Sequence, residues 1–155
     1  MTEALPRASG VCRAGSFSEP AIIDRVVLDA AERHRRRIVL TAERGTRFLL
    51  DLPQATTLHD GDGLVLEDGS IIRVAGKAET LIEVTATSAQ HLARLAWHIG
   101  NRHVDMQVLG STLRIRRDHV LEEMLLGLGA RLRPLDAPFD PEEGAYAQHH
   151  HGSPV

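Results

Sequence analysis

Cysteine is almost missing from this 155-residue chain, in which Cys12 is the only one. A single thiol excludes both a disulfide framework within one chain and a thiolate metal cluster. Any metal site must therefore be built from His, Asp and Glu side chains. The N-terminal residues also lack the apolar core of a signal peptide, so we expect a cytoplasmic protein.

Aromatic residues make up 3% of the chain, and the net charge is −3 with His counted as neutral. Neither value fits a nucleic-acid-binding protein, which needs a basic surface or aromatic side chains that stack on bases. The sequence also contains no apolar run long enough to span a membrane. We therefore expect neither nucleic acid nor a membrane among the partners.

Residues 1–78 show the pattern of an all-β domain. Short apolar runs lie at residues 25–29, 37–41, 47–51, 64–66 and 71–74, and the first two are rich in β-branched residues. Their length and spacing predict a small β-sandwich or open barrel, with a further edge strand near Val11. The basic run at residues 33–37 fits either a solvated hairpin tip or a docking patch for an acidic partner.

Residues 79–138 predict a different architecture, with the element order strand, helix, strand, strand, helix, strand. Ser88 is the expected N-cap of the first helix, which has one apolar stripe that ends at Ile99. Asp118 is the expected N-cap of the second helix, and Gly129 its stop signal. This order is that of the ferredoxin-like βαββαβ fold, so the whole chain is predicted to be α+β.

His103 stands out among the nine histidines of the chain. It follows Gly100 and Asn101, which are typical of a helix end, and it lies four residues after Ile99. Taken alone, it fits either a hydrogen-bonded interface histidine or a metal ligand, since neutral imidazole binds nickel, copper and zinc. A symmetric dimer places the same residue on both sides of its axis, which would turn one weak ligand into a usable pair.

Four other histidines have simpler expected roles. His34 and His59 fall in predicted turns and are expected to be exposed. His91 and His98 lie seven residues apart on one helix flank, where we expect packing or a hydrogen bond.

Residues 139–155 are predicted to form a flexible tail, because prolines, glycines and acidic residues leave little to pack. The tail contains three consecutive histidines, His149, His150 and His151. Such a tract is a compositional signal for metal binding, but an inert chain end can have the same composition.

The second half of the chain resembles the urease accessory protein E family, whose members are nickel metallochaperones. The motifs that carry this resemblance lie in the family order at residues 98–103, 113–115, 118–125, 138–142 and 144–146. Each motif is short, but their order makes them specific together. The resemblance continues more loosely through residues 24–86.

The resemblance implies a protein that is not an enzyme and that delivers Ni²⁺ for assembly of the urease active site. It implies a homodimer that holds the ion between two copies of His103 and works with the urease accessory GTPase and apo-urease. His119 and the tail histidines His149, His150 and His151 are the implied auxiliary ligands, and Zn²⁺ or Cu²⁺ would compete. Some family members carry another histidine where this chain has Arg117, so the auxiliary site is reduced or absent here and His119 is open to a purely structural role.

Two other functions compete with metal delivery. The β domain fits a protein-binding chaperone module that acts on urease maturation partners by offering a strand edge, without itself carrying the metal. An enzyme would need an acid–base pair, and the sequence offers Asp118 and His119 with Glu122 or Glu123 for that role. The sequence contains no Ser or Cys nucleophile motif and no Gly-rich phosphate loop, which disfavours the enzyme.

Overall fold

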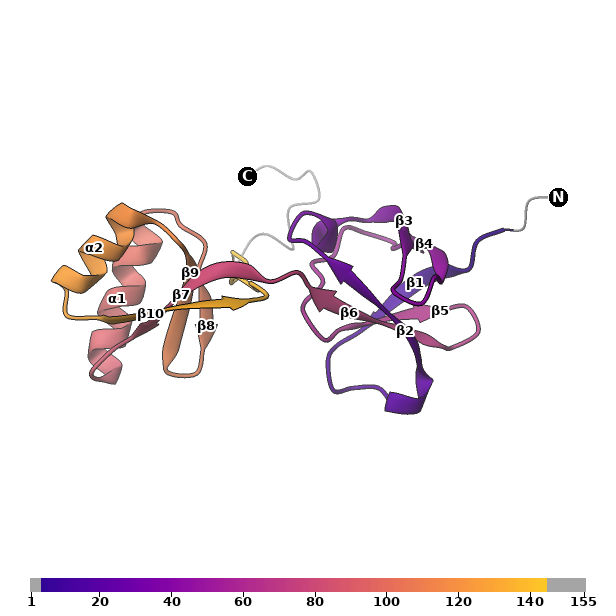
Figure 1. The fold of residues 1–155 in the computed structure, drawn as a ribbon, viewed down its shortest axis with the longest axis horizontal. Coiled ribbons are helices and arrows are strands. Elements are labelled where there is room, and N and C mark those ends of the chain that lie inside the picture. Colours follow the sequence, from indigo (N-terminus) through magenta and orange to yellow (C-terminus); the bar gives the residue numbers. More distant parts are fainter. Residues whose placement is uncertain (1–3, 145–155) are drawn as a thin grey trace. The chain divides into compact units, whose positions relative to one another are not determined.

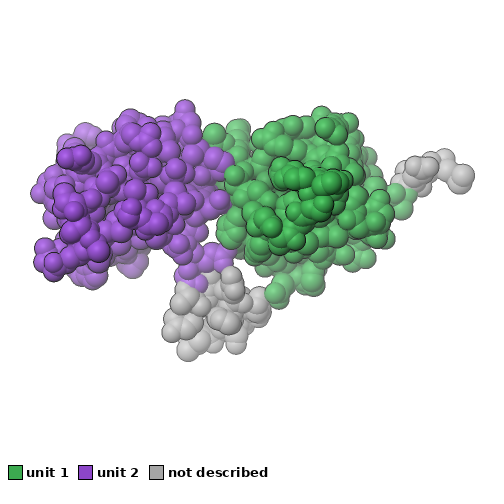
Figure 2. Space-filling view, turned by 90° about the horizontal axis from the view of Figure 1, so that it is seen from below, with its two compact units in different colours: residues 1–78 green, residues 79–155 purple. Residues whose placement is uncertain are grey.

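The computed structural model describes residues 4–144, which form two compact units that divide between Ala78 and Glu79 (Figure 2). The first unit is a curled β-sheet, and the second combines a β-sheet with two helices (Figure 1). This architecture confirms the α+β fold predicted from the sequence. In residues 4–144, no helix has both the length and the apolar content needed to cross a membrane.

The sheet of the first unit has six strands in the order β2-β6-β5-β1-β4-β3. Its strands are β1 (Arg7–Cys12), β2 (Ile22–Leu28), β3 (Arg37–Thr41), β4 (Arg47–Asp51), β5 (Gly63–Leu66) and β6 (Ile71–Gly76). A strand forms near Val11 as predicted, but its predicted position at an edge was wrong, because β1 pairs in parallel with β4 and antiparallel with β5. Short 3-10 turns, η1 (Glu19–Ala21) and η2 (Glu32–His34), flank β2.

Alternation along the strands builds the core of the first unit. In β2, Val26 and Leu28 are buried while Ile23 and Val27 point to solvent, because successive side chains of a strand face opposite sides. Phe48 and Leu50 in β4 face the same core. The first unit therefore buries one face of its curled sheet.

Asp24 holds the two edges of this curled sheet together. It lies in β2, is buried, and accepts hydrogen bonds from the backbone N–H groups of Arg25, Arg44 and Thr46 at 2.8, 2.9 and 3.2 Å. Arg44 and Thr46 belong to the turn between β3 and β4, at the opposite edge of the sheet. Burial raises the pKa of Asp24, but these bonds and one with the Thr46 side chain outweigh it, and the pKa is lowered.

The basic run at residues 33–37 does not form a hairpin tip. The strands on either side of it, β2 and β3, lie at opposite edges of the sheet and do not pair with each other. Arg33 is buried within η2, and its backbone carbonyl accepts a hydrogen bond from the N–H of Leu58 at 2.7 Å. The neighbouring side chains of His34, Arg35, Arg36 and Arg37 are exposed. The run is thus a structural connection with one buried arginine.

The second unit has a four-stranded antiparallel sheet in the order β10-β7-β9-β8, the strand order of ferredoxin-like folds. Its elements in chain order are β7 (Glu79–Thr85), α1 (Ala89–Asn101), β8 (Gln107–Leu109), β9 (Thr112–Arg116), α2 (His119–Gly127) and β10 (Arg131–Ala137). Leu95 and Ile99 of α1 pack with Leu121 and Leu125 of α2 and with the sheet. Both helices therefore cover one face of the sheet (Figure 1).

Capping residues set the helix ends as predicted. The side chain of Ser88 accepts from the N–H of His91, and that of Asp118 accepts from the N–H of Leu121. Gly129 has a positive φ of 87°, which ends α2 in the left-handed conformation that glycine adopts without strain.

We predict that Asp24→Ala lowers the free energy of unfolding of the first unit by about 1–3 kcal/mol, because it leaves buried N–H groups without an acceptor. Chemical denaturation measures this loss, and Asp68→Ala in an exposed turn is the control. Since the folded pKa of Asp24 is lowered, its contribution is complete above the unfolded pKa of about 3.9 and disappears as the pH falls through the folded pKa. Equal midpoints for the two variants at pH 7 would contradict this role.

Candidate metal centre

His103 lies two residues after the end of α1, in a backbone conformation that is rare for residues other than glycine. Its φ is +56°, and in residues 4–144 it is the only non-glycine residue with positive φ. Its N–H donates to the carbonyl of Gly100 at 3.0 Å, and the N–H of Arg102 donates to that of Ile99 at 3.1 Å. The left-handed residue thus ends the helix, and its side chain is exposed.

The sequence explains this helix end. The apolar stripe of α1 finishes at the buried Ile99, and Gly100 and Asn101 follow it as helix-stopping residues. Because the chain turns at His103, the imidazole does not extend the stripe into the core. The carbonyls at a helix C-terminus carry partial negative charge, so this position favours a nearby cation.

Asp105, Met106 and Gln107, the residues that follow the His103 turn, are held by contacts from distant parts of the second unit. Arg116 donates to Asp105 at 3.0 Å and to Glu79 at 2.8 Å. The hydrogen bond to Glu79 raises the pKa of Arg116 despite its partial burial, and the guanidinium stays charged. The guanidinium lies 4.6 Å from the centre of the Phe139 ring.

The chain after β10 also reaches these residues. Phe139 is fully buried, the N–H of Asp140 donates to the Gln107 side chain at 3.1 Å, and the N–H of Glu142 donates to the carbonyl of Met106 at 2.7 Å. We call residues 138–142 the C-terminal strap. The first residues of the predicted tail are therefore attached to the second unit.

His119 is the first residue of α2, and its side chain is 85% exposed. Its Nε2 lies 3.2 Å from a carboxylate oxygen of Glu123, one helical turn further along. The neighbouring acidic groups have structural roles, because Asp118 caps the helix and Glu122 binds both the Arg117 guanidinium and the N–H of Asp118. Burial raises the pKa of Glu122, but these bonds outweigh it and the pKa is lowered.

His91 and His98 lie on α1, as expected. Thr87 donates its N–H to Nδ1 of His91 at 3.0 Å, and Nε2 lies 2.7 Å from the carbonyl oxygen of Leu128. Because Nδ1 accepts, Nε2 must carry the proton and donate it. His91 therefore ties the start of α1 to the end of α2, while His98 packs edge-on against the Trp97 ring.

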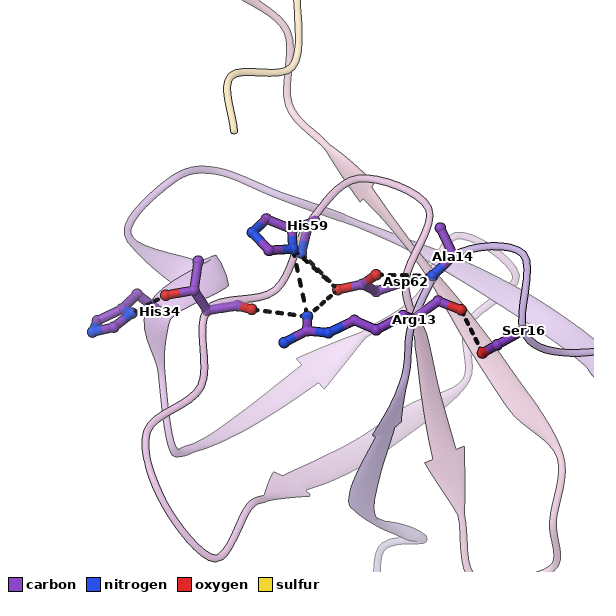
Figure 3. Close-up of polar contacts among 7 residues, drawn as sticks. Arg13, Ala14, Ser16, His34, His59 and Asp62 are labelled. Atoms are coloured by element: carbon purple, nitrogen blue, oxygen red, sulfur yellow. Dashed lines mark hydrogen bonds and ion pairs between the residues drawn. The ribbon is translucent and has the colours of Figure 1, made fainter. Parts of the chain in front are cut away.

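His34 and His59 belong to the first unit, where Figure 3 shows their surroundings. His34 is exposed, and its Nδ1 lies 2.8 Å from the hydroxyl of Thr57. His59 was expected to be exposed but is half-buried, and its backbone N–H donates to the buried carboxylate of Asp62 at 2.8 Å. Arg13 donates to the same carboxylate at 2.7 Å and lies 3.5 Å from Nδ1 of His59.

Within residues 4–144, no group of three or more His, Cys, Asp or Glu side chains comes close enough to hold a metal ion. The acidic turns around Asp60 and Asp68 accept backbone hydrogen bonds instead. His149, His150 and His151 lie outside the described residues. His103 and His119 are thus the candidate ligands that the structure places, each with an exposed imidazole.

Sequence reasoning missed the C-terminal strap and its partner Arg116. One signal was available, because Phe139 is one of only three phenylalanines in the chain and lies between two prolines. A bulky aromatic residue in a segment assigned to a flexible tail indicates burial. The hydrogen bonds of the strap to Met106 and Gln107 depend on the tertiary fold and leave no pattern in the sequence.

Comparison with known proteins gives matches over nearly the whole chain. Residues 8–76 match the N-terminal domain of the UreE urease accessory protein family, and residues 79–154 match its C-terminal domain. The chain is 57% identical over 134 residues to the urease accessory protein UreE of Bradyrhizobium sp. (strain ORS 278), with 85% of this chain and 64% of the relative covered.

Two further relatives extend this agreement. Identity is 52% over 147 residues to the UreE of Rhodopseudomonas palustris (strain HaA2), with 95% of this chain and 68% of the relative covered. Identity is 50% over 148 residues to the UreE of Beijerinckia indica, with 94% of this chain and 85% of the relative covered. The chain therefore spans about two thirds of the length of the first two of these relatives.

We predict that His103→Gly leaves the second unit at least as stable as the original chain, with a gain of up to about 1 kcal/mol, because glycine adopts positive φ without strain. Arg94→Gly, at an exposed position within α1, is the control and should lose about 1 kcal/mol. Thermal unfolding of both variants tests whether their changes in stability have opposite signs. A comparable loss of stability in both variants would mean that His103 does not adopt a left-handed backbone conformation.

Proposed function

This chain belongs to the UreE family of urease accessory proteins, and we propose that it carries Ni²⁺ for assembly of the urease active site. In this proposal it acts as a carrier and makes or breaks no bond in an organic substrate. It works with the urease accessory GTPase and apo-urease in the cytoplasm.

The observation that carries the proposal is the exposed imidazole of His103, turned outward at the C-terminus of α1 by a left-handed backbone. The helix carbonyls favour a cation there, and a neutral imidazole is a suitable nickel ligand. One imidazole binds a metal weakly, and residues 4–144 of one chain do not provide a three-ligand group. A homodimer with its two-fold axis beside His103 would supply two imidazoles from equivalent positions.

Such a site would bind nickel in an exchangeable way. Two imidazoles leave coordination positions open, which water or the tail histidines His149, His150 and His151 would fill. His119 is a further auxiliary ligand, although its contact with Glu123 also fits a role in starting α2. Ligand type does not select nickel by itself, since the Irving–Williams order favours copper and zinc competes. Partner docking and metal availability would then supply the remaining selectivity.

A second candidate function is a protein-binding module that acts without metal. The edge strands β2 and β3 of the first unit carry the exposed apolar side chains of Ile23, Val27 and Val39. An extended peptide could pair with such an edge and contact these side chains. Binding of apo-urease that is unchanged after nickel removal and after replacement of His103 would favour this function.

We predict that His103→Asn removes the tightest nickel site and leaves the protein folded, because asparagine tolerates the left-handed backbone but lacks the imidazole. Isothermal titration calorimetry with Ni²⁺ measures the loss, and sedimentation shows whether the dimer persists. His34→Asn, which removes an exposed imidazole of the first unit, is the control. Tight binding that survives in His103→Asn would exclude His103 as the ligand.

We predict that deletion of residues 147–155 lowers the nickel stoichiometry or affinity without unfolding the protein, because it removes three of the nine histidines. Replacing His149, His150 and His151 with serine should have the same effect at full chain length. An unchanged titration in both variants would make the tail irrelevant to metal binding.

A further inference from the structure

The C-terminal strap crosses one end of the sheet in the second unit. Strand β10 ends at Ala137, which pairs with Glu79 of β7. The strap then reaches Met106 and Gln107, at the start of β8. Because β10 and β8 are the two edge strands of this sheet, the strap passes the ends of β7 and β9 on its way.

The dimensions of a sheet agree with this path. Three steps between neighbouring strands separate β10 from β8. At about 4.8 Å each, they amount to roughly 14 Å. Five extended residues reach about 17 Å, so residues 138–142 are just long enough for the crossing. The strap is therefore an extended tie with little slack.

Arg116 fixes the middle of this path. It lies at the end of β9, binds Glu79 on one side and Asp105 on the other, and stacks on Phe139 of the strap. Phe139 is fully buried, so the strap cannot shift without opening this packing.

Three consecutive residues after the His103 turn are held in this way. Asp105 is bound by Arg116, the carbonyl of Met106 by the N–H of Glu142, and the side chain of Gln107 by the N–H of Asp140. A non-glycine residue with positive φ persists only where its surroundings fix it. Before the turn, helix α1 provides that restraint, and after it the strap and Arg116 do.

We propose that the C-terminal strap and Arg116 position His103 for nickel, so that Glu142, Asp140, Phe139 and Arg116 act as positioning residues of the metal site. This role rests on the proposed function of His103. A ligand held in its binding geometry loses less conformational freedom when the metal binds, so a fixed turn raises affinity without adding a ligand.

Glu142→Pro tests this role, because proline lacks the N–H that donates to Met106. Glu142→Ala keeps that N–H and is the matched control, since the Glu142 side chain is exposed. With the full chain, we expect about tenfold weaker Ni²⁺ binding by calorimetry in Glu142→Pro and unchanged binding in Glu142→Ala. Amide hydrogen exchange should accelerate at residues 103–107, with the dimer and the melting temperature unchanged.

Nickel affinity that stays within about twofold of the original while exchange accelerates would overturn the proposal, since the strap would then be structural only. If Glu142→Pro lowers the melting temperature, nickel affinity and hydrogen exchange are measured in Gln107→Met instead. This substitution removes the acceptor of the Asp140 N–H and keeps a side chain of similar volume. Weakened binding in His103→Asn with full affinity in Glu142→Pro would overturn only the strap's role. Nickel binding that does not depend on His103 would overturn the proposed function as well.

Discussion

The abrupt stop of α1 is the constraint on which the candidate metal centre depends. Buried Ile99 is the last residue that the core accepts from this helix. The left-handed His103 lies four residues later and closes the last turn through its N–H, which donates to the carbonyl of Gly100. A helix continued by one more turn would carry the imidazole back towards the apolar stripe. The stop instead leaves it exposed, beside carbonyl groups whose partial charges suit a cation.

Different interactions stabilise the interior of each unit. In the first, the buried carboxylates of Asp24 and Asp62 each accept backbone N–H groups from separate segments. In the second, leucine and isoleucine side chains of α1 and α2 pack against the sheet, and Arg116 adds ion pairs to Glu79 and Asp105 at one end. The curled sheet of the first unit is thus closed by buried carboxylates as well as by apolar packing.

Local patterns predicted the elements well, since caps at Ser88 and Asp118 and the stop at Gly129 act within a few residues of the chain. They do not predict pairing between distant strands, so the inner position of β1 and the connection at residues 33–37 between opposite edges of the sheet differ from the predicted edge strand and hairpin tip. His103 was identifiable as a helix-end residue, but its positive φ was not. The strap was missed because its hydrogen bonds join residues more than 30 positions apart.

The two hydrogen bonds of the His91 ring determine whether this imidazole can bind a metal ion. Thr87 occupies one ring nitrogen and Leu128 the other, so no lone pair of this imidazole is free towards solvent. Coordination through Nε2 would break the bond to Leu128 and so detach the start of α1 from the end of α2, whereas coordination through Nδ1 would break the bond to the Thr87 N–H. The fold of the second unit therefore keeps this imidazole from binding a metal ion as long as both hydrogen bonds persist.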